Sequence, residues 1–132
     1  SHVLRPLAVL LCRFRYVLLL ASDNMCLQDS TPLFQHLNDA QPAIFWKDYW
    51  RLDKKSLCYQ HFTAPQMEQL DDFCQTAAQM MIDKHSTVAA LQLCLTVNQE
   101  MYSQFHRLFP LPVNRTDKDT WTWAFILTDT PY

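Results

Sequence analysis

The side chains that could bind a metal or react with a substrate are scattered along this sequence. The best local metal-ligand pairs are Cys58 with His61, and Tyr102 with His106, because a helix would place both members of each pair on one face. A zinc site needs further ligands, and neither pair is accompanied by a second pair at a recognisable spacing. We therefore expect no metal site and no cofactor.

The acidic and thiol side chains do not form a catalytic pattern either. Asp71 and Asp72 are adjacent, so on a helix they would point about 100° apart and could not act together as acid and base. Cys74 and Cys94 fall among apolar residues, where a thiol is protonated and unreactive. A site assembled from distant positions leaves no mark in one sequence, but no local pattern predicts an enzyme.

The stretch from Ile44 to Lys55 reads IFWKDYWRLDKK and is dense in aromatic rings. On a helix that begins at Pro42, these rings gather on one side and the basic residues on the neighbouring arc. Binding of single-stranded nucleic acid needs rings and cations on one surface, so the pattern favours an amphipathic helix. Its rings would pack in the core or form an exposed docking face together with two C-terminal tryptophans. The predicted partner-binding residues are Phe45, Trp46, Tyr49, Trp50, Trp121 and Trp123.

From Met67 to Phe109, apolar residues recur with a heptad period. The period predicts one long helix, or a helix hairpin that turns at the polar run from Asp83 to Thr87. Two roles stay open, packing inside one domain and an intermolecular coiled coil. Asn98 occupies an inner position of the repeat, where its amide needs a partner that a symmetry-related copy would supply. The predicted self-association residues are Leu91, Leu95, Asn98, Tyr102 and Phe105.

Prolines mark the expected starts of the other helices, because proline is favoured in a first helical turn. The four that open apolar-periodic stretches are Pro6, Pro32, Pro42 and Pro65. Thr63 and Gln66 add the spacing of a capping box. A first helix is expected from about Pro6 to Ala21, although RFRYVLLL within it also alternates like a strand. Pro32 to Asp39 is expected to be a short helix.

The C-terminal part, residues 110–132, is expected to be an extended arm. Pro110 and Pro112 stop the preceding helix. From Trp121 to Leu127, large apolar residues alternate with mostly smaller ones at the period of a strand. We expect this arm to pack on the domain, and a free recruiting tail is the alternative.

The composition limits the class of protein. The chain has 132 residues, 49% of them hydrophobic and 18% charged, which predicts one compact domain spanning residues 1–132. It contains no glycine, which phosphate-binding loops and nucleophile elbows need, whereas helices tolerate its absence. The formal net charge of -2 gives no general attraction to nucleic acid.

The cysteines and the N-terminal run bear on location. Five cysteines without a CxxC pair predict reduced thiols and a cytoplasmic protein. Three arginines interrupt the apolar run that starts at Val3, so we expect neither a membrane span nor a signal peptide there. The glycosylation triplet Asn114-Arg115-Thr116 is interpreted as a chance match.

Together these patterns predict a mainly α protein, a bundle of four or five helices with one long heptad-patterned helix or hairpin and an extended C-terminal arm. The predicted function is a non-enzymatic interaction or assembly module whose partner is a protein, including a second copy of itself as a homodimer. One alternative is a peripheral protein that inserts its aromatic face into a membrane or lipid surface. A second is a small helical enzyme or metal-binding protein that uses His61, His85 or His106.

Overall fold

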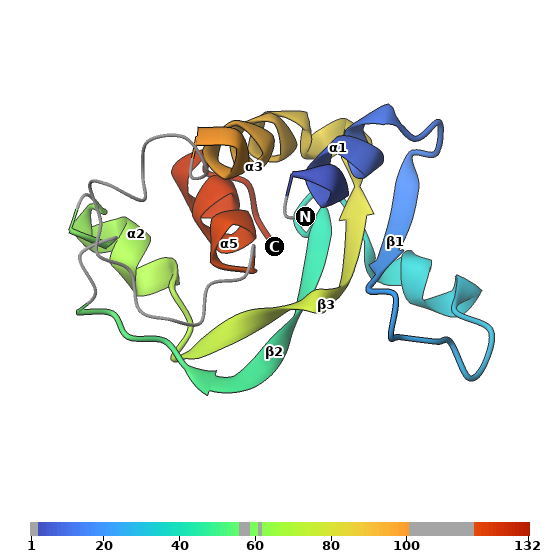
Figure 1. The fold of residues 1–132 in the computed structure, drawn as a ribbon, viewed down its shortest axis with the longest axis horizontal. Coiled ribbons are helices and arrows are strands. Elements are labelled where there is room, and N and C mark those ends of the chain that lie inside the picture. Colours follow the sequence, from blue (N-terminus) through green and yellow to red (C-terminus); the bar gives the residue numbers. More distant parts are fainter. Residues whose placement is uncertain (1–2, 56–58, 61, 101–117) are drawn as a thin grey trace.

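The chain folds as a mixed α/β structure, which Figure 1 shows in a computed structural model. The structure describes residues 3–55, 59–60, 62–100 and 118–132. The elements in chain order are α1 (Leu4–Leu11), β1 (Tyr16–Leu20), η1 (Thr31–His36), β2 (Ala43–Arg51), α2 (Ala64–Gln69), β3 (Phe73–Asp83), η3 (Lys84–Ser86), α3 (Val88–Glu100) and α5 (Lys118–Leu127). The three strands form an antiparallel sheet of order β1-β3-β2. The prediction of a mainly α bundle is therefore wrong.

The central strand β3 sets the register of the sheet. Met81 of β3 lies opposite Leu18 of β1 on one side and opposite Ile44 of β2 on the other. The pairing of β2 shifts after Phe45 and again after Lys47, so this strand bends as it follows β3. Met80, Met81 and Ile82 near the end of β3 are buried on both faces of the strand, which is why this part of its sequence lacks the alternation of a half-exposed strand.

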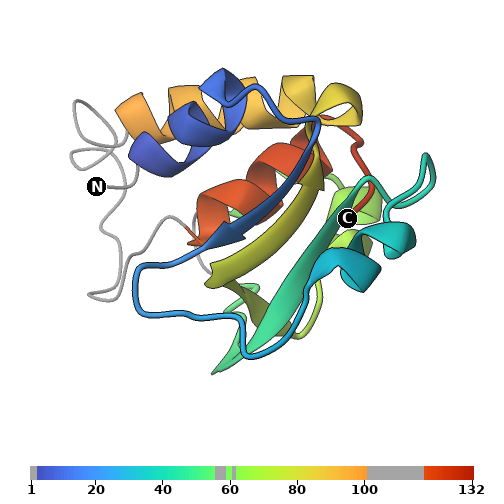
Figure 2. The ribbon, with the colours of Figure 1, turned by 90° about the vertical axis from the view of Figure 1, so that its right-hand side faces the viewer.

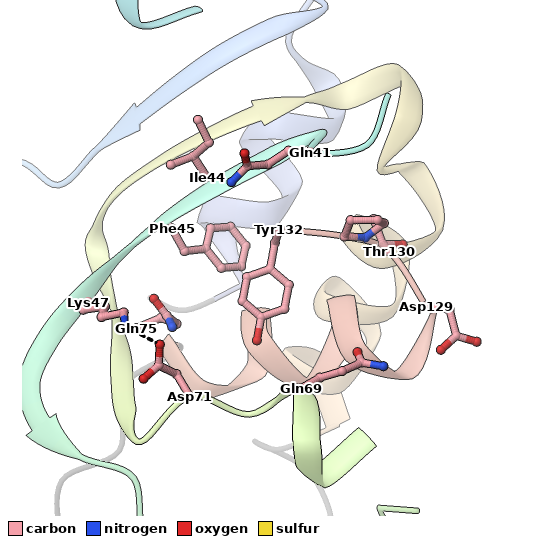
Figure 3. Close-up of a pocket in the computed structure, with 11 residues that line it drawn as sticks. Gln41, Ile44, Phe45, Lys47, Gln69, Asp71, Gln75, Asp129, Thr130 and Tyr132 are labelled. Atoms are coloured by element: carbon pink, nitrogen blue, oxygen red, sulfur yellow. Dashed lines mark ion pairs between the residues drawn. The ribbon is translucent and has the colours of Figure 1, made fainter. Parts of the chain in front are cut away.

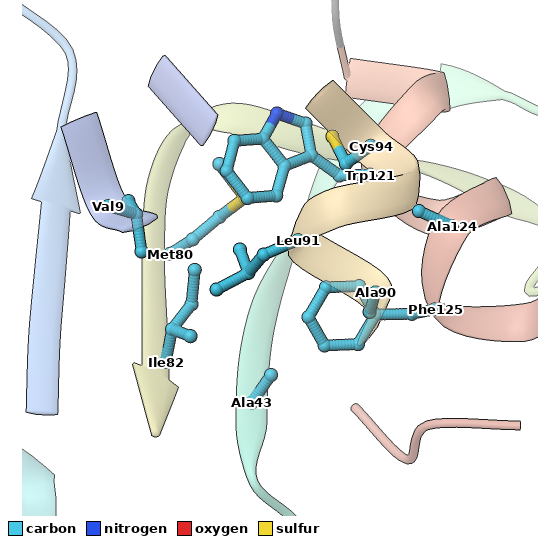
Figure 4. Close-up of a cluster of buried hydrophobic side chains, with 10 residues drawn as sticks. All are labelled: Val9, Ala43, Met80, Ile82, Ala90, Leu91, Cys94, Trp121, Ala124 and Phe125. Carbon is cyan, nitrogen blue, oxygen red and sulfur yellow. The ribbon is translucent and has the colours of Figure 1, made fainter. Parts of the chain in front are cut away.

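Three helices, α1, α3 and α5, lie together on one face of the sheet (Figure 2). The main hydrophobic core fills the space between them and the sheet (Figure 4). Its fully enclosed members include Trp121 and Phe125 from α5, Leu91 from α3, and Met80 and Ile82 from β3. At about 25 cal/mol per Å² of apolar surface, burial of these side chains is the main force that holds the helices on the sheet.

The aromatic stretch after Pro42 is the strand β2, so the predicted amphipathic helix from Pro42 to Lys55 is wrong. Isoleucine, phenylalanine, tryptophan and tyrosine are strand-forming residues, and pairing with β3 satisfies the backbone of the stretch. Adjacent side chains of a strand point to opposite faces of the sheet, so the rings do not share the single face that the predicted helix would have given them. The carbonyl of Pro42 accepts a hydrogen bond from the Asp83 amide at 2.7 Å and so extends the pairing with β3.

The heptad stripe from Met67 is divided among α2, β3, η3 and α3, so neither one long helix nor a helix hairpin is present and the coiled-coil prediction is wrong. The polar run from Asp83 to Thr87 does mark a helix start. The Asp83 carboxylate accepts a hydrogen bond from the amide of His85 at 3.1 Å, and the Thr87 hydroxyl donates to the Asp83 carbonyl at 2.9 Å. These bonds end the strand and lead into α3. The part of the stripe beyond Glu100, with Tyr102 and Phe105, lies outside the described residues.

The ends of the chain also differ from expectation. The run from Val3 to Ala21 is one short helix followed by the strand β1, because that strand pairs with β3. Residues 118–127 form α5, so the predicted extended arm is wrong there. This helix is buried on almost every side, and it therefore lacks the polar face that gives a helix its recognisable period. Residues 110–117 lie outside the described part of the chain.

Two predicted helix starts are confirmed. The capping box at Thr63 is present, and its amide donates to the Gln66 side chain at 3.0 Å where α2 begins. The short helix expected from Pro32 is the 3-10 turn η1, with the proline in its first turn.

Candidate functional site

A cavity of about 540 Å³ opens between β2, the junction of α2 with β3, and the segment that follows α5 (Figure 3). Pockets that hold small ligands usually have volumes between about 300 and 1,000 Å³. The lining residues are Gln41, Ile44, Phe45, Lys47, Gln69, Asp71, Gln75, Asp129, Thr130, Pro131 and Tyr132. Polar groups and aromatic rings thus meet in one cavity.

An ion pair lies on one side of the cavity. Lys47 of β2 contacts Asp71, two residues before β3, at 2.6 Å, and the side chains are 64% and 29% exposed. The Asp71 carboxylate also accepts a hydrogen bond from the amide of Phe73 at 3.3 Å. The hydrogen bond from Lys47 is the main reason why the pKa of Asp71 lies below its usual range. Asp71 is therefore an anion and a hydrogen-bond acceptor at neutral pH.

An aromatic wall faces this ion pair. The ring of Tyr132 lies 5.0 Å from that of Phe45, and Phe45 in turn meets the core ring of Phe125 edge-on at 4.9 Å. Burial, with a smaller contribution from the charge of Asp71, raises the pKa of Tyr132 to about 12. Its phenol stays protonated at neutral pH and keeps a hydrogen to donate. The wall is fixed because it continues into the hydrophobic core.

The segment that carries Tyr132 is held by a helix-ending turn. The amides of Thr130 and Asp129 donate to the carbonyls of Phe125 and Ile126 at 2.9 and 3.1 Å, the bond pattern of a Schellman motif. Asp129 has φ of 50°, a left-handed conformation that glycine usually provides and that aspartate tolerates better than most residues. The Thr128 and Thr130 hydroxyls are 2.8 Å apart and add to the turn. In a chain without glycine, this aspartate directs the C-terminal segment back over the cavity.

The remaining lining groups favour binding rather than proton transfer. Three glutamine amides offer both donors and acceptors, and Gln75 is buried. Asp71 is held as an anion by Lys47, and a carboxylate with a lowered pKa is a poor general base. Amides, a hydroxyl and carboxylates beside an aromatic wall suit a ligand with many hydroxyl groups and an apolar ring face.

The predicted partner-binding rings do not gather on one surface. Phe45 and Trp121 belong to the core region, and Trp123 packs in a second cluster with Tyr59. Trp46 is half-buried. Among the predicted rings, Tyr49 and Trp50 at the far end of β2 are exposed to solvent, at 98% and 68%. Binding of a protein partner stays a prediction for these two rings.

The predicted self-association residues lie on or beyond α3. Leu91 is buried in the core and Leu95 is half-buried, whereas Tyr102 and Phe105 lie outside the described residues. The Asn98 amide finds its partners within the chain, donating to Thr120 of α5 at 2.9 Å and to the Cys94 carbonyl at 2.8 Å. A second copy is not needed to satisfy it, and self-association stays a prediction.

The residues that could ligate a metal do not converge in the part of the chain that the structure describes, where no group of three histidine, cysteine or acidic side chains could hold an ion. Both predicted ligand pairs, Cys58 with His61 and Tyr102 with His106, include residues outside that part. Among residues 3–55, 59–60, 62–100 and 118–132, no helix is long and apolar enough to cross a membrane.

Sequence reasoning predicted Phe45 as a binding residue and missed the other lining residues that carry the site. Lys47 and Asp71 are far apart in sequence, and they meet only because β2 pairs with β3, with Lys47 opposite Gln75. Asp71 was considered only together with its neighbour Asp72. The signal that could have found the site is the strand character of the stretch after Pro42, which would have placed Lys47 beside the start of β3.

Comparisons with known proteins give this geometry a context. Residues 2–77 match the family described as "Mannosyltransferase putative". The whole chain is 24% identical to the alpha-1,2-mannosyltransferase MNN23 of Candida albicans, and it spans 28% of the length of that relative. No solved structure matches the chain. The predictions of a non-enzymatic interaction module and of an adaptor are wrong, because both matches point to glycosyltransferases.

Proposed function

This chain belongs to that mannosyltransferase family, and from this premise we propose that it takes part in the transfer of mannose to a sugar hydroxyl group. The relative in Candida albicans has an alpha-1,2-mannosyltransferase name, which supports an alpha-1,2 linkage as the product.

The observation that carries the proposal is the overlap of the cavity with the family match. Seven of the eleven lining residues fall within residues 2–77, and the seven are Gln41, Ile44, Phe45, Lys47, Gln69, Asp71 and Gln75. Of these seven, Gln41, Gln69, Asp71 and Gln75 are polar, Phe45 is aromatic, Ile44 is apolar and Lys47 is a cation. The matched segment therefore builds most of a cavity suited to a sugar.

The proposed reaction forms a bond between the acceptor hydroxyl oxygen and the anomeric carbon of mannose. The bond from that carbon to the leaving oxygen of an activated donor breaks, and the hydroxyl proton passes to a base. The cavity residues bind and orient a sugar in this scheme. Asp71 accepts hydroxyl hydrogens and Tyr132 donates its phenolic hydrogen, while the aromatic wall excludes water from one side.

We also propose the secretory pathway as the location of the protein, because mannosyltransferases typically act in the lumen of the Golgi. This proposal replaces the cytoplasmic compartment that the cysteines suggested. Among the described residues, Cys12, Cys26 and Cys74 are free thiols. Fractionation of cells that express the tagged protein would check the location.

A transfer assay tests the proposed function. The purified protein is incubated with GDP-mannose and a fluorescent α-mannoside, and the product is weighed by mass spectrometry. We expect a product heavier by one hexose that an α-1,2-specific mannosidase converts back to the acceptor. GDP-glucose serves as the control donor and should give no product. Absence of a heavier product with GDP-mannose would contradict the proposal.

A further inference from the structure

We infer that the cavity between β2 and the segment after α5 binds the uncharged acceptor saccharide and not the charged donor of the transfer reaction. This inference rests on the proposed function, because it names which substrate of that reaction the cavity holds. Three features of the described residues support it: the charge of the lining, the helix ends that face the cavity, and the aromatic wall.

The charge of the lining disfavours a phosphate. Lys47 is the single cation among the described lining residues, and its charge is already compensated by Asp71 at 2.6 Å. Asp129 adds a second carboxylate. A nucleoside diphosphate brings about two further negative charges, and such groups are normally held by several cations or by backbone amides. An uncharged saccharide meets no such repulsion.

The helix ends lead to the same conclusion. The lining segment Asp129 to Tyr132 follows the C-terminal end of α5, and Gln69 is the last residue of α2. The C-terminal end of a helix carries a partial negative charge, which repels phosphate. The anionic Asp71 at this place can instead accept hydrogen bonds from hydroxyl groups.

The aromatic wall gives the saccharide a surface to pack on. The ring of Tyr132 is half-buried against Phe45, and Figure 3 shows both rings beside the polar side chains of the cavity. The face of a hexose that bears only C–H groups packs on such a ring, while its hydroxyl edge reaches Asp71, Gln75 and the Tyr132 hydroxyl. A cavity of about 540 Å³ leaves room for more than one sugar ring.

Binding titrations with the full 132-residue chain test this inference. The two probes are methyl α-mannoside and GDP-mannose, each titrated by calorimetry into the wild type and into Asp71→Asn. Loss of a charged hydrogen-bond acceptor should weaken mannoside binding about 10-fold or more, because hydrogen bonds to charged groups are stronger than those between neutral groups. Any GDP-mannose binding should stay within about twofold, because a donor bound outside this cavity would not contact Asp71.

Asp72→Asn is the matched control, because it removes the same charge at the next position, where the side chain pairs with Lys54 outside the cavity. It should leave mannoside affinity unchanged. If Asp71→Asn does not fold, as judged by circular dichroism, Gln69→Ala replaces it, since Gln69 is exposed and lines the cavity. We expect that variant to weaken mannoside binding by a smaller factor.

The outcomes separate this inference from the proposed function. A change of more than about twofold in GDP-mannose binding, in either direction, with unchanged mannoside binding would assign the cavity to the donor and overturn the inference. The absence of mannoside binding, or binding indifferent to both cavity variants, would overturn it as well. Mannoside binding that depends on Asp71 in a protein that transfers no mannose would support a saccharide site in this cavity and contradict the proposed function.

Discussion

Two ion pairs of this molecule have the same kind of partners and different surroundings. Arg15 and Asp83 join the approach to β1 with the end of β3 through two parallel hydrogen bonds of 3.0 and 2.8 Å, and the Asp83 side chain is 3% exposed. Lys47 and Asp71 meet through one contact at the edge of a cavity. Each oxygen of the Asp83 carboxylate accepts two hydrogen bonds within the protein. The Asp71 oxygens accept one from Lys47 and one from the Phe73 amide, which leaves capacity for a ligand.

The difference lies in the number of partners that converge on each carboxylate. Besides Arg15, Asp83 accepts hydrogen bonds from the His85 amide and from the Ser86 hydroxyl at 3.3 Å. It therefore ties β1, β3 and the start of α3 together. Buried carboxylates with complete partners serve stability, while a half-exposed one beside a cavity is available for recognition.

Asp83→Asn should have the largest effect on stability. The amide keeps the shape of the carboxylate but loses its charge and one acceptor, so Arg15 and the His85 amide lose part of their bonding. We expect the free energy of unfolding to fall by about 2 to 3 kcal/mol. Urea unfolding followed by circular dichroism measures it, and a loss below about 0.5 kcal/mol would contradict the structural role.

The same pair should produce a pH dependence. The hydrogen bond from Arg15 is the main reason why the pKa of Asp83 lies below its ordinary value of 3.8, so the unfolded chain binds this proton more readily. The stabilisation is complete above about pH 4 and is lost as the pH falls through the folded-state pKa. Urea titrations from pH 7 to pH 3 should show the gap between wild type and Asp83→Asn narrowing only at the acid end.

Asp71→Asn should change stability much less. Its pair is single and half-exposed, so the free energy of unfolding should fall by less than about 1 kcal/mol. In the same urea assay, the loss of unfolding free energy for Asp71→Asn should be clearly smaller than the loss for Asp83→Asn. Equal losses from the two variants would mean that Asp71 is also a structural carboxylate, which would remove the reason to assign it to a ligand.

Asp72→Asn should have the smallest effect. Asp72 is 75% exposed and pairs with Lys54 at 3.1 Å on the surface. Such pairs contribute little, so the expected change in the free energy of unfolding is within about 0.5 kcal/mol. Lys54 also donates to the Leu70 carbonyl at 2.8 Å and keeps that bond in the variant. A larger loss would show that the charge of Asp72 itself stabilises this region, and unfolding at increasing salt concentration would then test that electrostatic effect.

Local signals in the sequence predicted some helix starts and little of the sheet. The Thr63 capping box and the polar run before Val88 are chain-local features, and both mark real helices. The strands depend on partners far away in sequence, and an aromatic run such as the one after Pro42 satisfies a helical and an extended pattern alike.

The candidate site was harder still to predict. It depends on the pairing of β2 with β3 and on the return of Tyr132 over the cavity, which brings it to Phe45. Helix α5 is buried on almost all sides, so its residues carry no period from which its position could be inferred.

The turn at Asp129 joins the cavity to the innermost helix. Its amide and that of Thr130 are bonded to carbonyls near the end of α5, and Tyr132 lies only two residues further on. A ligand held by Tyr132 thus restrains the last turn of a helix whose other end lies against α3. Hydrogen exchange at the Asp129 and Thr130 amides should slow when a ligand fills the cavity. Binding in a surface cavity would then be detected through the reduced opening of a core helix.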